Sequence, residues 1–550
     1  MPRKRHEEGV EWRDCRTKGG TRVVLPYRHQ ALTDFSAPEN RRAMGAALEA
    51  VRAAMGRSYP LVIGGRRVFT DEAIVSTNPG RPNEVIGRVS KATASHIDEA
   101  LDAGWEAFGI FRRQPGAVRA RYLYRAAAIM RRRRLELAAW EVFEAGKNWP
   151  EADADVAEAI DFLEYYGRHM EELDRPVPLT PLEGEDDTAF YVPLGVGAII
   201  PPWNFPLAIL TGMTAGAVVA GNPVVLKPAS PTPVIAEKFM DIMEEAGLPP
   251  GVINLLPGDG GVIGDYLVSH PRVRFVSFTG SREVGLRINA LAAQAGKGQR
   301  WIKRVVAEMG GKDAIIVDET ADLDDAAQGI VTSAFGFQGQ KCSACSRAIL
   351  VEPVYEAVVE RVVALTERLR VGQADDPESD MGPVIDQRAF DKIMAYIDWG
   401  KHHARLLYGG GRVGNEGYFI QPTIFGDVDP ASKLGQEEIF GPVLAVMRAK
   451  DFDEALRIAN GTEYGLTGSV YTRRRDRIEQ AREEFEVGNL YINRKITGAL
   501  VDRQPFGGFK LSGIGSKAGG PDYLQQFLLP RAICENTMRH GFVPSPPSIH

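Results

Sequence analysis

Apolar residues recur every three or four positions through the first third of the chain, the spacing of one face of an α-helix. This pattern predicts helices over residues 39–55, 95–111, 116–146 and 153–173. From about residue 191 short runs rich in Val, Ile and Leu alternate with further helical segments. The runs predict buried strands at 196–200, 222–228, 252–258, 273–280, 312–318 and 348–353. Such alternation is typical of βαβ units around a mostly parallel sheet, so we expect an α/β fold.

Two segments fall outside this alternation. Residues 1–36 are polar and lack periodicity, which predicts a loose N-terminal lead-in with order starting near Leu25. Residues 174–193 form two extended runs around an acidic turn at Gly184, a pattern that predicts a projecting hairpin. Because a two-stranded arm is unstable without a partner, we expect a homodimer or a higher homo-oligomer.

Composition and charge narrow the class of protein. The 550 residues include 66 Lys and Arg and 72 Asp and Glu, a net charge of −6, with 44% hydrophobic residues. These values are those of a globular protein and argue against disorder, collagen and coiled coil. Nucleic acid is not an expected partner, because no basic block dominates the chain. The one dense basic run, Arg131–Arg134, lies in a helical pattern and predicts a solvated helix face.

The cysteines and the apolar segments indicate the compartment. Four cysteines, Cys15, Cys342, Cys345 and Cys534, are too few for a disulfide framework and lack zinc-site spacing, so we expect no metal and a reducing environment. The first 20 residues contain no apolar core of an export signal. The most apolar stretch, 192–226, is interrupted by five prolines, so no membrane span is expected. We therefore expect a cytoplasmic protein.

A strand, a turn and a helix follow one another in VRFVSFTGSREVG, where Gly280 and Ser281 form the turn. The N-terminus of such a helix offers unpaired N–H groups and a positive dipole end to a phosphate. The spacing is neither GxGxxG nor a P-loop, and a turn whose glycine serves packing alone is an equal alternative. Lys227 and Ser230 follow another strand and strengthen the hypothesis of a dinucleotide site.

Three further residues carry candidate chemistry. Cys342 lies in a turn rich in Gly, Gln and Ser, where a thiolate can be reached as a nucleophile; Cys345 competes for this role, and a buried inert thiol is the alternative. Glu308 ends an apolar run, as a general base with a raised pKa requires, although an ion pair or a helix cap is also open. Asn204 offers an amide to a developing oxyanion. Together these groups predict covalent oxidation of an aldehyde.

The motifs PPWNFP, LKPAS, FTGSREVG, EMGGK, GQKCSACSR, EEIFGPV and PFGGFKLSG occur in the order found in the aldehyde dehydrogenase superfamily. The chain resembles that superfamily from about Leu25 onward, and GQKCSACSR, YINRKITGALVDRQPFGGFKLSG and SKAGGPDYLQQF resemble its L-glutamate γ-semialdehyde (1-pyrroline-5-carboxylate) dehydrogenase branch. The resemblance implies an NAD-binding Rossmann-like domain (37–173 and 194–306), an α/β catalytic domain (307–500), and an oligomerisation arm with a C-terminal substrate-anchor region (174–193 and 501–550).

The resemblance also assigns roles to individual residues. Cys342 matches the nucleophile, Asn204 and the Cys342 backbone N–H the oxyanion donors, and Glu308 the residue that activates the hydrolytic water. The cofactor expected is NAD, although NADP stays open because many NAD-selective members have Glu where Ser230 stands. The residues matched to cofactor binding are Trp203, Lys227, Ser230, Gly280, Ser281, Val284, Glu438 and Phe440.

For the substrate, the branch implies oxidation of L-glutamate γ-semialdehyde, which is in equilibrium with 1-pyrroline-5-carboxylate, to L-glutamate in the second step of proline degradation. The residues matched to substrate binding are Ser343, Gly519 and Gly520 around the α-carboxylate, and Phe205 and Phe527 around the aliphatic chain. Without the resemblance, the glycines indicate only a turn. Two alternatives remain: another ω-semialdehyde as the substrate, since one methylene changes selectivity modestly, and a non-catalytic protein on the same fold.

Overall fold

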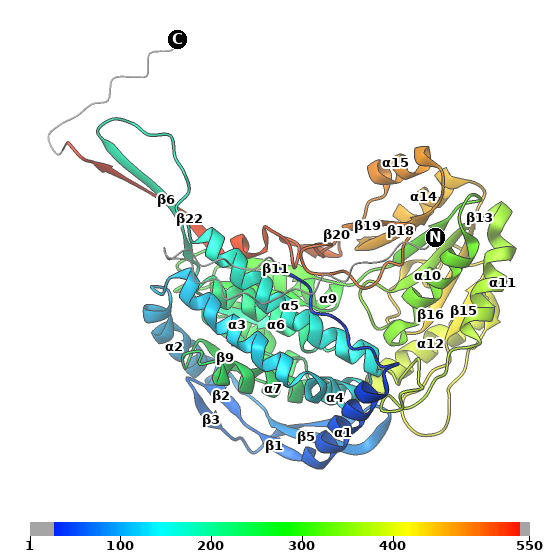
Figure 1. The fold of residues 1–550 in the computed structure, drawn as a ribbon, viewed down its shortest axis with the longest axis horizontal. Coiled ribbons are helices and arrows are strands. Elements are labelled where there is room, and N and C mark those ends of the chain that lie inside the picture. Colours follow the sequence, from blue (N-terminus) through cyan, green and yellow to red (C-terminus); the bar gives the residue numbers. More distant parts are fainter. Residues whose placement is uncertain (1–26, 539–550) are drawn as a thin grey trace, which may run out of the picture.

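The structure, a computed structural model, describes residues 27–538. Two large sheets occupy separate lobes, and a two-stranded arm projects from the first lobe (Figure 1). Both sheets are packed with helices on their two faces, so the α/β class predicted from the sequence is confirmed. Residues 1–26, including Cys15, lie outside the described part of the chain. The domain boundaries drawn from the resemblance stay a prediction.

The first sheet has eight strands, ordered β21-β11-β10-β7-β8-β9-β2-β3. Its five central strands are parallel. From β7 the chain passes to β8 and β9 on one side and then returns to β10 and β11 on the other, so the switch point lies between β7 and β10. Ligands of open α/β sheets bind at the carboxyl ends of the strands at such a point. The strands are β2 (Leu61–Ile63), β3 (Arg66–Val68), β7 (Gly197–Ile200), β8 (Val224–Leu226), β9 (Ile253–Leu255), β10 (Phe275–Thr279), β11 (Arg304–Glu308) and β21 (Gly513–Ile514).

The second sheet has seven strands, ordered β14-β15-β16-β13-β12-β18-β19, and all its pairs except β14–β15 are parallel. Successive residues of β12 face opposite cores, with Ile315 in one cluster and Ile316 in the other. This two-sided burial explains the continuous apolar run in the sequence. The strands are β12 (Asp313–Val317), β13 (Cys345–Val351), β14 (Arg405–Tyr408), β15 (Thr423–Gly426), β16 (Val443–Ala449), β18 (Thr467–Tyr471) and β19 (Asn489–Ile492).

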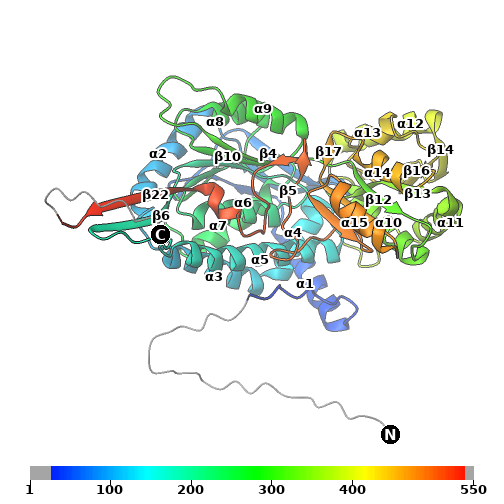
Figure 2. The same cartoon turned by 90° about the horizontal axis from the view of Figure 1, so that it is seen from above.

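Helices α3 and α5 pack side by side along one face of the first lobe, and α8 and α9 cover the opposite face (Figure 2). The first-lobe helices are α1 (Pro38–Ala54), α2 (Ala94–Phe111), α3 (Gly116–Arg132), α4 (Arg134–Ala145), α5 (Trp149–Leu173), α6 (Ala208–Val219), α7 (Pro233–Glu245), α8 (Asp265–Ser269) and α9 (Arg282–Ala292). The second lobe has α10 (Leu323–Phe335), α11 (Tyr355–Thr366), α12 (Gln387–His403), α13 (Lys433–Gln436), α14 (Phe452–Asn460) and α15 (Arg475–Glu484). The small sheets contain β1 (Arg57–Tyr59), β4 (Ala73–Asn78) and β5 (Arg81–Ser90), and β17 (Tyr464–Gly465) with β20 (Phe509–Lys510).

The basic run at the junction of α3 and α4 differs from its prediction. The segment expected as one helix divides at Arg133, whose φ of −100° and ψ of 16° end α3. The solvated face is wrong for Arg134, which is 12% exposed and forms two hydrogen bonds, of 2.5 and 2.6 Å, with Asp153. The other three arginines also meet carboxylates: Arg131 at Glu164, Arg132 at Glu245 and Arg133 at Glu136.

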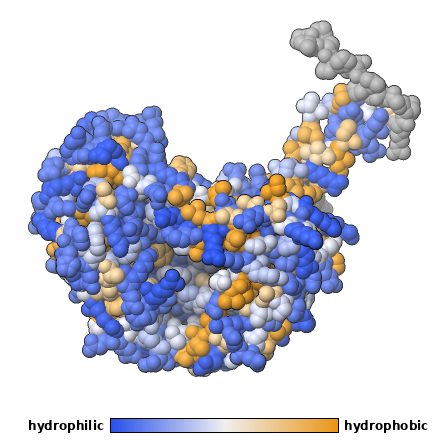
Figure 3. Space-filling view, turned by 180° about the vertical axis from the view of Figure 1, so that it is seen from behind, coloured by the Kyte–Doolittle hydropathy of each residue, from blue (hydrophilic) through white to orange (hydrophobic). Residues whose placement is uncertain are grey.

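The arm consists of β6 (Glu185–Pro193) and β22 (Leu528–Asn536), which pair antiparallel over their whole length. The predicted pairing within 174–193 is wrong, since the first run contributes a single bridge, Val177 to Ala189. The reason is its three prolines between residues 176 and 181, which have no N–H to donate to a ladder. The C-terminal strand takes that place, and apolar residues lie along the arm (Figure 3).

A fully buried charge cluster joins the end of α4 to α5. The Lys147 ammonium contacts the carboxylates of Asp155 and, at 3.2 Å, Glu141, and it lies 4.5 Å from the centre of the Phe205 ring. Burial alone would lower the pKa of Lys147, but the two carboxylates raise it. Asp155 also accepts the Ala208 backbone N–H at 2.5 Å, which fixes the first turn of α6. The cluster therefore holds α4, α5 and α6 together.

We expect Lys147→Ala to lower the free energy of unfolding by about 3 kcal/mol or more, because it leaves a buried carboxylate without its counter-charge. Urea unfolding followed by circular dichroism measures this loss. Arg475→Ala is the matched control, because Arg475 forms an exposed pair with Glu479 and its removal costs about 0.5 kcal/mol or less. Equal losses in the two variants would contradict the buried-pair argument.

Candidate active site

A cavity of about 590 Å³ opens between the lobes and brings together residues that are far apart in the sequence. Four predicted site residues line it, Cys342, Glu308, Phe205 and Ser343. Its wall continues along one face of α5. Other residues of this wall include Glu151, Glu158, Asp161, Tyr166, Lys341, Arg494, Lys495, Ala518 and Tyr523.

The loop that carries Cys342 runs from the end of α10 to the start of β13. Phe337, Gln338 and Gly339 all have positive φ, so the chain reverses sharply there. A Cβ on Gly339 would lie 2.3 Å from the Gly441 carbonyl oxygen, so only glycine fits this bend. The Gln338 side chain fixes the bend by donating to the carbonyl groups of Gly146 and Pro383, at 3.1 and 2.8 Å.

The two neighbouring cysteines have different surroundings. Cys342 is partly exposed and lines the cavity, whereas Cys345 is the first residue of β13 and is buried in the core. The Cys345 thiol contacts the Arg347 carbonyl at 3.4 Å. The geometry therefore favours Cys342 as the nucleophile and gives Cys345 a packing role. Burial, followed by the charges of Glu308, Asp313 and Glu438, raises the pKa of Cys342, so the resting group is a thiol.

Glu308 is the last residue of β11 and reaches the same cavity. Burial raises its pKa to about 8, and the Ala518 backbone N–H and the Lys517 charge only partly oppose this shift. A carboxyl group with such a pKa gains or loses a proton near neutral pH. It is therefore matched to the task of a general base that accepts a proton from a thiol or a water.

Asn204 follows β7 and is 4% exposed. One of its amide N–H groups donates to the Gln340 carbonyl at 3.0 Å, two residues before Cys342. This bond holds the amide against the nucleophile loop and leaves the second N–H of the amide for another acceptor. Its role as an oxyanion donor stays a prediction that this placement favours.

The predicted cofactor residues follow the carboxyl ends of the parallel strands of the first sheet. Lys227 and Ser230 come after β8, and Gly280 and Ser281 come after β10, with Ser281 capping α9 through the Val284 N–H. Lys227 is 5% exposed, and burial lowers its pKa to about 8. The N-terminus of α9 thus lies at the switch point, where a pyrophosphate is stabilised by the helix dipole.

The other half of the candidate cofactor site lies on the second lobe. Glu438 accepts the Gly311 N–H at 3.0 Å, and a Cβ on Gly310 would lie 2.1 Å from a Glu438 oxygen. The close approach of this carboxylate therefore requires glycine. The Phe440 ring meets Trp203 edge to face at 5.5 Å across the lobes. These donors and acceptors fit a dinucleotide that lies between the lobes.

Three residues predicted to bind substrate are placed differently. Gly519 donates its N–H to the Tyr166 hydroxyl at 2.9 Å, and Gly520 donates to the Lys517 carbonyl at 3.1 Å, so both amides have partners within the protein. Ala518 lies on the cavity wall instead. A carboxylate can bind these two amides only if the hydrogen bonds to Tyr166 and Lys517 are broken.

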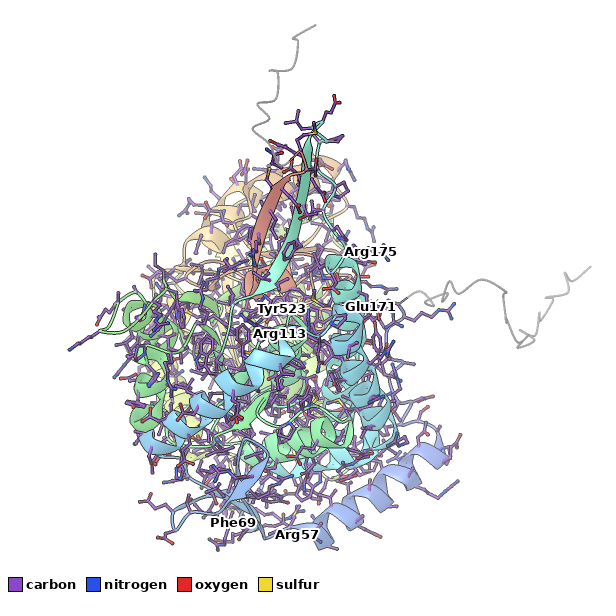
Figure 4. All side chains as sticks on the ribbon, turned by 90° about the vertical axis from the view of Figure 1, so that its left-hand side faces the viewer. Arg57, Phe69, Arg113, Glu171, Arg175 and Tyr523 are labelled. Carbon is purple, nitrogen blue, oxygen red and sulfur yellow. The ribbon has the colours of Figure 1, made fainter. Side chains whose placement is uncertain are left out.

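Phe527 does not line the cavity. Its ring is fully buried, 5.2 Å from Phe275 and 5.5 Å from Tyr523. The two residues share a short 3₁₀ helix, Tyr523–Phe527, which places Tyr523 on the wall and Phe527 behind it. Tyr523 lies at the base of the arm (Figure 4). The Tyr523 ring, and not the expected Phe527, therefore lies on the cavity wall.

Most residues of the cavity wall were not predicted from the sequence. Lys341 pairs with Glu151 at 2.7 Å, and Arg494 and Lys495 add positive charge. The acidic residues on the otherwise apolar face of α5 were the feature of the sequence that could have indicated this wall. Residues 27–36 also pack against the body, because polar groups of α5 bind their backbone. This agrees with the predicted start of order near Leu25 but not with a loose lead-in that extends to residue 36.

The comparisons with known proteins agree with this geometry. The chain matches the aldehyde dehydrogenase family over residues 69–533, and it belongs to that family. A 1-pyrroline-5-carboxylate dehydrogenase from Geobacillus kaustophilus (strain HTA426) is 58% identical over 513 residues, which cover 93% of this chain and all of the relative.

Solved structures extend the likeness. The 1-pyrroline-5-carboxylate dehydrogenase from Thermus with bound NAD is 55% identical, with a TM-score of 0.92 over 94% of this chain and all of that chain. Proline utilization A (PutA) from Bdellovibrio bacteriovorus is 46% identical, with a TM-score of 0.92 over 95% of this chain and 54% of that chain. None of the helices in the described range 27–538 is long and apolar enough to span a membrane.

The pKa of Glu308 predicts the pH dependence of turnover. The carboxylate accepts a proton only when ionised, so we expect the rate of acyl-enzyme hydrolysis to rise with pH and to level above about pH 8. Glu308→Gln should release about one NADH per site in a fast phase and then turn over roughly 100-fold or more slowly. Stopped-flow absorbance measures both phases. Glu479→Gln on exposed α15 is the control, and an unchanged steady state in Glu308→Gln would exclude this role.

Proposed function

We propose that this chain oxidises L-glutamate γ-semialdehyde to L-glutamate with NAD, the second step of proline degradation. The observation that carries the proposal is one cavity that holds the Cys342 thiol, the Glu308 carboxyl and the Ser343 side chain in a chain matching 1-pyrroline-5-carboxylate dehydrogenases over their whole length. Lys341, Arg494 and Lys495 give the cavity the positive charge that a carboxylate substrate needs.

The reaction begins at Cys342. The thiol passes its proton to a water molecule in the cavity, and the sulfur attacks the aldehyde carbon to form a thiohemiacetal. The second amide N–H of Asn204 and the backbone N–H of Cys342 stabilise the oxyanion that develops on the former carbonyl oxygen. NAD, when bound between the lobes, would supply the hydride acceptor, and loss of the hydride would leave a thioester on Cys342. Trp203, Lys227, Ser230, Gly280, Ser281, Val284, Glu438 and Phe440 are the residues that would hold NAD.

Hydrolysis then returns the enzyme to its starting state. Glu308 takes a proton from a water molecule, the water oxygen attacks the thioester carbonyl, and the carbon–sulfur bond breaks. The carboxylate product leaves, and the thiol of Cys342 is restored. Because the cavity shields Glu308 from bulk water, its carboxyl group stays basic enough for this transfer at neutral pH.

The substrate's α-carboxylate is assigned to the end of the cavity near Ser343 and residues 518–520. Ser343 offers a hydroxyl beside the nucleophile, and the amides of Gly519 and Gly520 become donors when the carboxylate replaces their present partners. Phe205 packs along the aliphatic chain. We retain Phe527 as a support for Tyr523 on this wall, not as a direct contact.

Initial rates with three aldehydes test the proposed function. We expect NAD reduction with 1-pyrroline-5-carboxylate to exceed that with succinate semialdehyde or propanal in kcat/KM, and to be abolished in Cys342→Ala. Cys345→Ala, which changes a thiol outside the cavity, should keep the activity. Rates measured in parallel with NADP test whether Ser230, in place of a glutamate, allows NADP to bind. A flat substrate profile would retain the aldehyde dehydrogenase mechanism and reject the assigned substrate.

We also propose that the protein is a homodimer or a higher homo-oligomer in a reducing, cytoplasmic setting. The arm supports the first point, because Val177, Leu179 and Leu182 beside β6 and Ile533 on β22 are 38–45% exposed. The need for a free Cys342 thiol supports the second. We expect light scattering to give an even multiple of the 60.2 kDa chain mass, and deletion of residues 528–550 to shift it to the monomer. A monomeric full-length chain would reject the arm's role.

A further inference from the structure

The short 3₁₀ helix Tyr523–Phe527 carries part of the cavity wall at one end and leads into the arm at the other. Tyr523 lies on the wall, and its ring is nearly parallel to that of Tyr166, with 5.1 Å between the two ring centres. Leu528, which directly follows the helix, is the first residue of β22. A shift of this 3₁₀ helix would therefore move the cavity wall, so the contacts that hold the helix bear on the substrate site.

Arg304 holds the C-terminal end of the 3₁₀ helix. It is the first residue of β11, the strand that ends in Glu308. Its guanidinium donates through Nη1 to the carbonyl oxygens of Gln526 at 3.0 Å and Leu528 at 2.9 Å. The last carbonyl groups of a helix have no partner within the helix, and hydrogen bonds from a charged donor are stronger than neutral ones. Arg304 therefore fixes the 3₁₀ helix to the strand that carries the general base.

Gln526, on the same helix, holds residues 515–520, the loop that contains the assigned carboxylate end. Its side-chain Oε1 accepts the Ser516 backbone N–H at 3.0 Å. A Cβ on Gly515, whose φ is +117°, would lie 2.8 Å from the same oxygen, so this close approach requires glycine. Ala518, two residues after Ser516, lies on the cavity wall. The link that starts at β11 therefore continues through the 3₁₀ helix to the loop.

The loop has a second anchor, which differs from the first in what happens when substrate binds. The Gly519 N–H donates to the Tyr166 hydroxyl at 2.9 Å, a bond that the substrate carboxylate must replace. The bond between Ser516 and Gln526 lies three residues earlier and does not involve the amides assigned to the substrate. It can persist while Gly519 changes partner, so the loop keeps one fixed point during substrate binding.

We propose that Arg304 and Gln526 are positioning residues for the substrate carboxylate. Together they hold residues 515–520 in place while the Gly519 amide exchanges the Tyr166 hydroxyl for the substrate. The inference rests on the proposed function and adds to it two residues that do not touch the substrate, since neither side chain lines the cavity. An aldehyde without a carboxylate does not need the loop, so its oxidation is independent of both residues.

Steady-state kinetics with two aldehydes test this role. We expect Gln526→Ala to raise KM for L-glutamate γ-semialdehyde by about fivefold, the effect of one lost hydrogen bond, with kcat changed by less than about twofold. The kcat/KM for propanal should not change. Arg304→Gln should give the same pattern, and Arg304→Lys, which keeps the positive charge, should recover part of the loss. The double variant should lose less than the two single losses combined, because both residues act through one helix.

Two matched controls leave the link intact. Arg274→Gln removes an arginine next to the neighbouring strand β10 that donates to the Ile302 carbonyl at 2.7 Å, and Gln525→Ala changes an exposed side chain of the same 3₁₀ helix. Both should keep the wild-type KM values. Equal losses for the semialdehyde and propanal in Gln526→Ala would show a merely structural role and overturn the inference, as would an unchanged KM.

The same measurements separate this inference from the proposed function. A wild type that oxidises propanal as well as the semialdehyde would reject the proposed function, and this inference with it. A wild type that prefers the semialdehyde, together with Arg304 and Gln526 variants that keep this preference, would reject the inference alone.

Discussion

Exclusion of water from the space between the two parallel sheets is the constraint on which the rest of the site depends. Burial raises the pKa of Glu308 to about 8, and it also raises the pKa of Cys342, so Cys342 rests as a thiol. Glu308 is then poised to exchange protons near neutral pH. The same burial makes an unpaired charge expensive, and Lys341 on the cavity wall is paired with Glu151 at 2.7 Å.

The sheet topology explains how so many reactive groups meet in one place. Parallel strands deliver their carboxyl ends to one edge, so Asn204, Lys227, Ser281 and Glu308 converge although 104 residues separate the first from the last. The second sheet supplies Cys342 from a loop that precedes its strand β13. The thiol and the base therefore come from different lobes, and the cavity exists only where the lobes meet.

The sequence was sufficient for the features that depend on local pattern. Apolar runs identified the strands, and a turn rich in small polar residues identified the loop that carries Cys342. Burial in the structure then separates Cys342 from Cys345, which the local pattern left open. It was insufficient where a long-range partner decides the outcome. Nothing near Gly519 indicates that Tyr166 takes its N–H, and nothing in the prolines of residues 176–181 names β22 as the partner of β6. Phe527 was misplaced because one turn of 3₁₀ helix separates the wall from the core.

The buried Lys147 cluster connects stability to chemistry. Its ammonium lies against the Phe205 ring, and its partner Asp155 binds the backbone at Ala208, so both ends of the segment after Asn204 are fixed by one charge pair. A hydrophobic replacement of similar volume could hold the helices as well. Such a replacement could not orient the Phe205 ring by cation–π attraction. It also could not hold the start of α6 by a hydrogen bond to a charged group. The geometry of the cavity wall, more than the stability of the fold, therefore accounts for a lysine at this buried position.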